Sequence, residues 1–350
     1  MDISGELCNN HILIKKSSDI GRLYNKSHIG KPLSGNVLQL DLLEGVFLIN
    51  EGKMQLFQNK KPVTFSELLM LAAQQIPEFE TKYIVYKDLR NRGHAITLAF
   101  NDTPITFSKI KKNDEDVDSC VIVAFSERDI LEIAKTKQLI QQNTKNNNAL
   151  WFALVDEEGD LTYYDISKMK INGDNSEHQY QKGTCILLKN RLILFDKKLV
   201  HQLYEKEFFG KPFGEILQLS FVEGLYLLER GILDIQTKDG ILLSMKKCIM
   251  AMEKLQPDIR QRLLVFRDLK QRGLLVKTGF KFGAHFRAYT HRPEKTHAEY
   301  LIHVVEKEYT SIWAEISRAV RLAHSVNKEF VFACIDNKII EYIKVGRLRP

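Results

Sequence analysis

The chain has 350 residues, 44% of them hydrophobic and 27% charged, with 19 Gly, 8 Pro and a formal net charge of +7. This composition is typical of a globular protein and excludes the collagen-like, low-complexity and disulfide-stapled miniprotein classes. The length predicts two or three folding units, each with enough chain to bury a core.

No apolar run approaches the ~20 residues that span a bilayer, and the N-terminal residues lack the basic and apolar segments of a signal peptide. We therefore expect a cytoplasmic protein with no membrane partner. The five cysteines are widely separated and form no Cys-x-x-Cys pair. They indicate neither a disulfide framework nor a zinc site, and we expect reduced thiols.

The charge is unevenly distributed along the chain. Residues 1–180 carry 21 Lys and Arg against 25 Asp and Glu, whereas residues 181–350 carry 30 against 19. A basic half of this size predicts contact with a polyanion, and the asymmetry predicts that the two halves meet across copies of the chain. A solvated basic face is the alternative that charge alone leaves open.

An internal repeat with a period of about 180 residues organises the sequence. The matching segments are Gly30-Lys31-Pro32 with Gly210-Lys211-Pro212, Leu38-Gln39-Leu40 with Leu217-Gln218-Leu219, and residues 85–93 with residues 265–273. A period this long indicates a duplicated domain pair rather than a solenoid. The polar, turn-rich stretch 172–183 predicts the linker. The expected units are a first repeat at 1–171, with subdomains at about 1–80 and 81–171, and a second at 184–350, with subdomains at about 184–260 and 261–350.

The elements expected along each repeat are short strands, then two helices, then further strands and a helix. The predicted strands are 11–15, 46–49, 185–188, 225–228, 300–305 and 330–335. The predicted helices are 65–76 and 244–255, with Ser66 and Ser244 as N-caps, two helices ended by Gly93 and Gly273, and 310–324. This mixture predicts an α/β or α+β fold, with an N-terminal and a C-terminal α/β subdomain in each repeat.

The second repeat carries titratable residues that the first lacks. Tyr289, His297 and Lys328 fall at positions where a shift of 180 gives Lys109, Val117 and Asn148. Residues found in one copy only are not required by the shared fold, so this set is a candidate functional site. Four other histidines compete with it, His285, His291, His303 and His324; His285 is the main rival of His297, and His303 lies in a predicted strand.

The second repeat resembles the archaeal tRNA-splicing endonucleases, specifically the type in which one chain holds two units and dimerises. The motifs that carry the resemblance are Gly279-Phe280-Lys281-Phe282-Gly283, Phe286-Arg287-Ala288-Tyr289, His297-Ala298-Glu299-Tyr300-Leu301, Lys328-Glu329-Phe330-Val331 and Arg347-Leu348-Arg349-Pro350. The resemblance implies a nuclease-like C-terminal subdomain, a degenerate, non-catalytic first repeat and a catalytic triad of Tyr289, His297 and Lys328. It also implies that precursor tRNA is the substrate and that the bulge–helix–bulge junction is cut.

These residue types suit cleavage of RNA by its own 2′-OH, independently of the resemblance. The reaction needs a base for the 2′-OH proton, an acid for the leaving 5′-oxygen and a cation for the phosphorane. Tyr289, His297 and Lys328 fit these roles, and the products would be a 2′,3′-cyclic phosphate and a 5′-OH. Because the free pKa of tyrosine is about 10, we expect Lys328 or Arg287 to lower the pKa of Tyr289. The sequence predicts no metal or cofactor.

Further residues are expected to hold RNA and to join two chains. The resemblance implies that Arg321 sandwiches a bulge base. We expect a second arginine from the active unit of the partner chain, with Arg347 and Arg349 as equal candidates, and we expect Lys281 and Arg287 to contact phosphates. It also implies that the acidic loop of the first repeat enters a basic pocket of a second copy, giving a homodimer. This acidic loop consists of Asp156, Glu157, Glu158 and Asp160.

Two other functions remain open at this point. A non-catalytic RNA-binding or assembly subunit would bind the junction without cutting it. A metal-dependent DNA nuclease would need paired acidic residues and divalent ions, so its activity would be sensitive to chelators.

Overall fold

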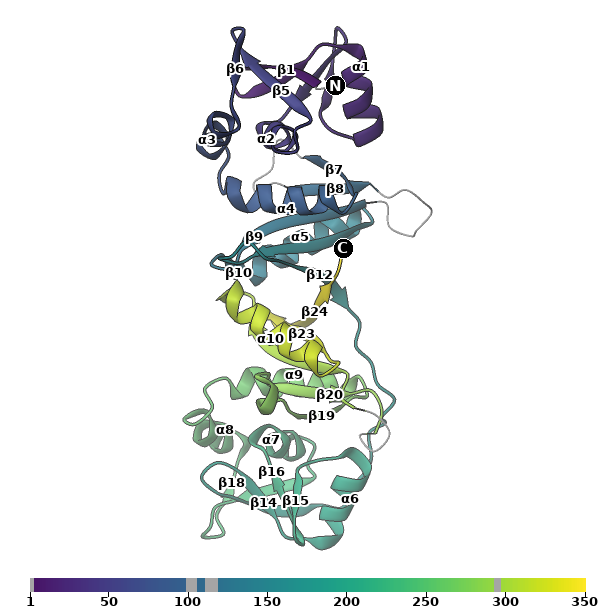
Figure 1. Ribbon diagram of the computed structural model, residues 1–350. Coiled ribbons are helices and arrows are strands. Elements are labelled where there is room, and N and C mark those ends of the chain that lie inside the picture. Colours follow the sequence, from purple (N-terminus) through teal and green to yellow (C-terminus); the bar gives the residue numbers. More distant parts are fainter. Residues whose placement is uncertain (1–2, 99–105, 111–118, 293–296) are drawn as a thin grey trace.

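The computed structural model describes residues 3–98, 106–110, 119–292 and 297–350, with the backbone alone described for 106–110 and 119. The molecule is elongated (Figure 1). The two N-terminal subdomains lie at its ends, and the two C-terminal subdomains meet in the middle, where the chain also ends. The expected fold class, a mixed α+β tandem duplication, is confirmed.

Both N-terminal subdomains have a six-stranded sheet with the same strand order, β3-β4-β2-β1-β5-β6 in the first and β15-β16-β14-β13-β17-β18 in the second. The first comprises β1 (Ile3–Cys8), β2 (His11–Ile14), α1 (Ser17–Ile20), the π-helical turn η1 (Gly21–Lys26), β3 (Lys31–Leu33), β4 (Val37–Leu40), α2 (Leu42–Asn50), β5 (Met54–Gln58), β6 (Lys61–Val63) and α3 (Phe65–Gln75). The second comprises β13 (Gly183–Leu187), β14 (Leu192–Leu194), α6 (Lys197–Glu207), β15 (Lys211–Phe213), β16 (Ile216–Leu219), α7 (Phe221–Glu229), β17 (Leu233–Gln236), β18 (Leu242–Leu243) and α8 (Met245–Glu253).

The C-terminal subdomains share one ten-stranded sheet, ordered β19-β20-β21-β23-β24-β12-β11-β9-β8-β7. The first contributes α4 (Phe79–Asn91), β7 (Ala95–Leu98), β8 (Thr106–Ile110), β9 (Ser119–Ser126), β10 (Ile130–Glu132), α5 (Ile133–Lys145), β11 (Asn148–Val155) and β12 (Leu161–Met169). The second contributes α9 (Ile259–Gln271), β19 (Leu275–Thr278), the 3₁₀ turn η2 (Phe280–Phe282), β20 (Phe286–Tyr289), β21 (Tyr300–Glu306), β22 (Thr310–Ile312), α10 (Trp313–Ser325), β23 (Glu329–Asp336) and β24 (Ile339–Leu348).

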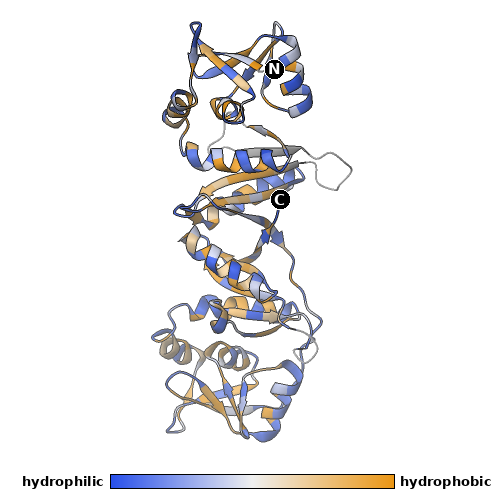
Figure 2. Ribbon diagram, in the orientation of Figure 1, coloured by the Kyte–Doolittle hydropathy of each residue, from blue (hydrophilic) through white to orange (hydrophobic). Residues whose placement is uncertain are grey.

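The two repeats are joined by strand pairing and by a common core. Strand β12 pairs antiparallel with β24, with Ile166 opposite Val345, and β10 pairs with β22. Trp313 of the second repeat is fully buried, and its ring lies 5.6 Å from that of Phe152 in the first. Because one hydrophobic cluster holds residues of both repeats, the central sheet is a single packed unit. The apolar strands of this sheet are visible in Figure 2.

Two segments predicted as strands, 46–49 and 225–228, are helical and belong to α2 and α7. Both helices are buried on nearly all sides, so their short apolar runs show no helical period in the sequence. Capping boxes start them, with Asp41 and Glu44 in the first repeat and Ser220 and Glu223 in the second.

The predicted helix starts are partly right. Ser244 caps α8 as expected, but Thr64, not Ser66, caps α3, because Glu67 completes a capping box with Thr64. The helix predicted from Thr310 begins at Trp313, because 310–312 form β22.

Residues 170–182 join the repeats as an extended segment that runs along the second repeat. The backbone N–H groups of Gly173 and Asn175 donate to the carbonyls of Arg272 and Gly273, at 2.8 and 2.9 Å. Gly273 has φ +76°, and a Cβ there would lie 2.5 Å from the Gly173 carbonyl oxygen, so both the backbone conformation and the close approach require glycine. Within the described residues, every helix is too short or too polar to cross a membrane.

Candidate active site

Three neighbouring strands of the second repeat, β20, β21 and β23, share one register where β20 ends and the other two begin. Ala288 of β20 lies opposite Tyr300 of β21, which lies opposite Glu329 of β23. Beyond these pairs, the Glu299 N–H donates to the Ala288 carbonyl at 3.1 Å, and the Glu329 N–H donates to the Glu299 carbonyl at 2.8 Å. The end of β20 and the starts of β21 and β23 are therefore held side by side.

This register brings Tyr289 and Lys328 to one end of the sheet, and His297 shortly precedes β21 in the sequence. Tyr289 is the last residue of β20, Lys328 directly precedes β23, and His297 lies three residues before β21. Neighbouring strands lie about 4.8 Å apart, so the backbones of Tyr289 and Lys328 are separated by about 10 Å.

The Tyr289 side chain is nearly buried, at 6% exposure, and packs with Leu275, Ala298 and Phe208. The Arg287 guanidinium lies 5.8 Å from the centre of its ring. Burial raises the pKa of Tyr289, and Arg287 opposes this rise only in part. The expected lowering of the Tyr289 pKa is therefore wrong in direction, because the loss of water around the phenol outweighs the nearby positive charge.

Arg287 supplies positive charge beside Tyr289, and Lys328 lies two strands away. The Lys328 ammonium donates to the Val326 carbonyl at 3.2 Å and lies 5.8 Å from the centre of the Phe282 ring. The Arg287 Nε is buried without a hydrogen-bond partner in the described part of the chain, which leaves a donor for an anionic ligand. Lys281 is exposed on η2, next to Phe282.

His297 is exposed, and a polar contact closes the segment that carries it. The Glu299 carboxylate accepts hydrogen bonds from the Thr290 N–H and hydroxyl, at 3.0 and 2.7 Å. Thr290 follows Tyr289 directly, so this contact ties both ends of the 290–299 segment together. This contact was not among those expected from the sequence.

His285, the rival of His297, has a different environment at the start of β20. Its Nδ1 accepts the Val304 N–H at 2.8 Å, and its ring lies 4.4 Å from that of His303. Burial lowers the pKa of His285 to about 3. It is therefore a neutral imidazole rather than an imidazolium near neutral pH, which leaves His297 as the better candidate acid.

The strand register corrects one residue pairing between the repeats. Ala95 lies opposite Ile110 in the first repeat, as Leu275 lies opposite Tyr289 in the second. The counterpart of Tyr289 is thus Ile110 rather than Lys109, because the loop before β8 is one residue longer than the loop before β20. Asn148 remains the counterpart of Lys328, because Ala149 lies opposite Cys120 as Glu329 lies opposite Tyr300. Val117 lies outside the described residues.

The predicted RNA contacts fall into two groups. Lys281 and Arg287 lie near Lys328 and Tyr289, as described above. Arg321 and Arg347 are exposed and flank Tyr164 of the first repeat: burial raises the pKa of Tyr164, and the charges of both arginines oppose that rise. Arg347 also lies directly opposite Tyr164 in the sheet. Arg349 is exposed beyond β24.

The acidic loop forms the turn between β11 and β12. The Asp156 carboxylate accepts the N–H groups of Glu158 and Asp160, at 3.0 and 2.9 Å, so it folds the turn. Glu157, Glu158 and Asp160 are all exposed, and Glu157 pairs with Arg128 of the same chain. The described residues contain no group of three or more His, Cys, Asp or Glu that could hold a metal ion.

Comparison with known families gives a match to each subdomain. The family model for the tRNA intron endonuclease catalytic C-terminal domain matches residues 79–163 and 259–342, and that for the N-terminal domain matches residues 3–69 and 184–249. The chain belongs to the tRNA intron endonuclease family. This confirms the family and the enzyme class, an endonuclease, expected from the motifs. Because the catalytic-domain model matches both repeats, assigning activity to the second rests on its side chains.

Individual relatives agree with the family match. The chain is 32% identical to the tRNA-splicing endonuclease of Methanococcoides burtonii over 350 residues, covering 98% of this chain and 99% of the relative. It is 30% identical to that of Methanosarcina barkeri over 349 residues, with the same coverage. The enzyme of Methanopyrus kandleri is 38% identical over 151 residues, which are 41% of this chain and 84% of the relative. A shorter relative of this kind fits the duplication.

Proposed function

We propose that the chain excises introns from precursor tRNA at bulge–helix–bulge junctions, without a metal, by attack of the 2′-OH on the adjacent phosphodiester. The products are a 2′,3′-cyclic phosphate and a 5′-OH. The observation that carries the proposal is the shared register of β20, β21 and β23, which holds the backbones at Tyr289 and Lys328 at one end of the sheet, with His297 three residues before β21.

The three side chains take distinct roles in this reaction. Tyr289 accepts the 2′-OH proton, His297 protonates the leaving 5′-oxygen, and Lys328 stabilises the charge on the phosphorane. Arg287 adds a second cation whose buried Nε can donate to a phosphate oxygen. The raised pKa of Tyr289 predicts that the cleavage rate keeps increasing at alkaline pH.

The proposal extends to RNA grip and assembly. Lys281 contacts a phosphate, and Arg321 with Arg347 stacks on or pairs with a flipped bulge base. Two chains form a C₂ homodimer in which the acidic loop of each first repeat meets the basic second repeat of the other. Support comes from the charges of −4 and +11 on the two halves and from the exposure of Glu158 and Asp160. The first repeat is non-catalytic, with Ile110 and Asn148 in place of Tyr289 and Lys328.

The experiment is cleavage of an end-labelled bulge–helix–bulge RNA by the full chain in excess EDTA, with analysis of the product ends. Cuts in both bulges that leave cyclic phosphates support the proposal. Binding without cutting favours the non-catalytic subunit, and cutting that EDTA abolishes favours a metal-dependent nuclease. The matched substrate carries 2′-deoxy sugars at the two cleavage sites and should stay intact.

A further inference from the structure

The Tyr289 ring is held by a residue of the other subdomain. Phe208, at the end of α6, meets it edge to face, with ring centres 6.5 Å apart and planes at 71°. Tyr289 has no hydrogen bond from its hydroxyl to any described residue, so ring packing sets the direction of that hydroxyl. Edge-to-face contacts contribute about 1 kcal/mol beyond burial and favour one relative orientation.

Phe208 itself is fixed in an unusual backbone conformation. Its φ of +60° is left-handed, which is uncommon for a bulky side chain. The Lys277 ammonium holds this turn: it donates to the Phe208 carbonyl at 2.8 Å and to the Gly210 carbonyl, and lies 5.0 Å from the centre of the Phe208 ring. Glu223 lies 3.5 Å from the same ammonium and accepts the Gly210 N–H at 2.8 Å.

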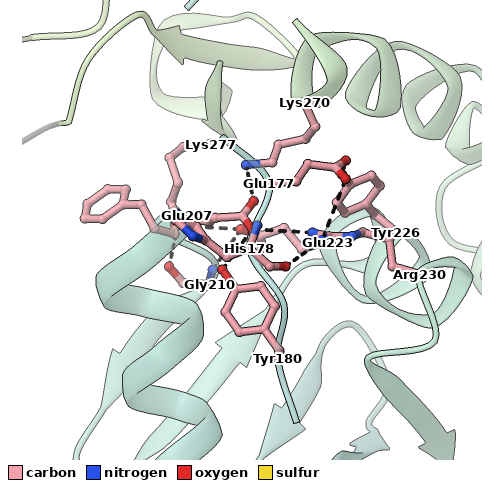
Figure 3. Close-up of polar contacts among 11 residues, drawn as sticks. Glu177, His178, Tyr180, Glu207, Gly210, Glu223, Tyr226, Arg230, Lys270 and Lys277 are labelled. Carbon is pink, nitrogen blue, oxygen red and sulfur yellow. Dashed lines mark hydrogen bonds and ion pairs between the residues drawn. The ribbon is translucent and has the colours of Figure 1, made fainter. Parts of the chain in front are cut away.

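A buried ion pair anchors the residue before Phe208. The side chains of Glu207 and Lys270 are 0% and 2% exposed and approach to 2.9 Å, which links the two subdomains of the repeat. Glu207 also accepts the Tyr180 hydroxyl at 2.8 Å, and Figure 3 shows it among Lys270, Tyr180 and Arg230. Breaking a buried ion pair by removing one partner costs several kcal/mol of stability, so the pair holds the backbone next to Phe208 firmly in place.

The first repeat keeps the turn but not these anchors. His28 occupies the position of Phe208, with a similar φ of +51°. There Arg90 holds the turn by donating to the carbonyls of Ser27 and His28, at 2.7 and 3.0 Å. Thr97 stands where the second repeat has Lys277. Phe208, Lys277 and the Glu207–Lys270 pair are therefore found in the repeat that has Tyr289, and not in the repeat that has Ile110.

We propose that Phe208 is a positioning residue for Tyr289, through which the N-terminal subdomain of the second repeat aims the phenol hydroxyl at the substrate. Lys277 and the Glu207–Lys270 pair hold Phe208 in place. The inference rests on the proposed role of Tyr289 as the general base. Since small misplacements of a reacting group can cost about 100-fold in rate, loss of this contact should affect chemistry more than RNA binding.

The test measures single-turnover cleavage of bulge–helix–bulge RNA by the full chain and its Phe208→Ala and His28→Ala variants. Phe208→Ala should cleave about 10- to 100-fold more slowly. Its affinity for the 2′-deoxy RNA should equal that of the unaltered chain. The rise of rate with pH should shift to lower pH, because water reaches the Tyr289 ring and relieves the burial that raises its pKa. His28→Ala should behave as the unaltered chain does.

The outcomes separate this inference from the proposed function. If the unaltered chain does not cut the RNA, the function fails. If it cuts and Phe208→Ala cuts equally fast with an unchanged pH profile, the positioning role is wrong. Should Phe208→Ala fail to fold by circular dichroism, Phe208→Met decides in the same way: a shifted pH profile supports the role, and an unshifted one overturns it.

Discussion

Glu299 is hydrogen-bonded to Thr290 across the segment that carries His297: its carboxylate accepts both the backbone N–H and the hydroxyl of Thr290. These hydrogen bonds join the residue after Tyr289 to the residue before β21. We expect Thr290→Val, which deletes the hydroxyl donor, to lower the single-turnover cleavage rate about tenfold by freeing the His297 segment. Thr290→Ser keeps both donors and is the matched control. Equal rates for the two variants would contradict this role.

Dimerisation through the acidic loop should depend on its exposed carboxylates. The double variant Glu158→Gln, Asp160→Asn leaves Asp156 intact, since Asp156 folds the turn. It should raise the dimer dissociation constant at low salt and have less effect at ~0.5 M salt, where screening is strong. Sedimentation velocity measures the dissociation constant at both salt concentrations. Glu157→Gln, whose residue pairs within the chain, should have a smaller effect; an intact dimer in the double variant argues against loop insertion.

Glu44 should make the stability of the first repeat depend on pH. Burial raises the pKa of Glu44 from 4.5 to about 7, so the folded state binds more protons than the unfolded state between these values. Stability therefore falls as pH rises through this window, by up to about 3 kcal/mol. Urea unfolding at pH 5 and 7.5 tests this. Glu44→Gln should flatten the pH dependence, and parallel curves for the two proteins would refute the assignment.

The buried Glu207–Lys270 pair should stabilise the second repeat only as a pair. Lys270→Met leaves a buried carboxylate without its cation and should cost about 3–5 kcal/mol in the free energy of unfolding. Adding Glu207→Gln removes that charge and keeps an acceptor for Tyr180, so most of the loss should return. Denaturant titration distinguishes these cases. A single variant as stable as the double one would show that the pair contributes little.

Much of the fold could be predicted from the sequence because the repeat doubles every local signal. The matched segments around Gly30 and Gly210 predicted two equivalent subdomains, and both have the same strand order. The strands at 46–49 and 225–228 were wrong because a helix buried on all sides gives the same apolar run as a buried strand. The pairing of β12 with β24 carries no local signal, since it joins segments about 180 residues apart.

Some features of the candidate site could likewise be predicted from the sequence, and others could not. Tyr289, His297 and Lys328 could be found because the first repeat lacks them. A constant shift of 180 residues between the repeats pairs Tyr289 with Lys109. The strand register pairs it with Ile110, because the first repeat has one more residue in the loop before β8. The contact of Phe208 with Tyr289 crosses two subdomains, so only the packed structure reveals it.

The most direct test of the account is cleavage of end-labelled bulge–helix–bulge RNA in excess EDTA by the chain carrying His297→Ala. The account predicts that this variant binds the junction with unchanged affinity and cuts neither bulge, while the unaltered chain cuts both and leaves cyclic phosphates. Cutting by His297→Ala at the unaltered rate would contradict the assignment of the triad to the second repeat.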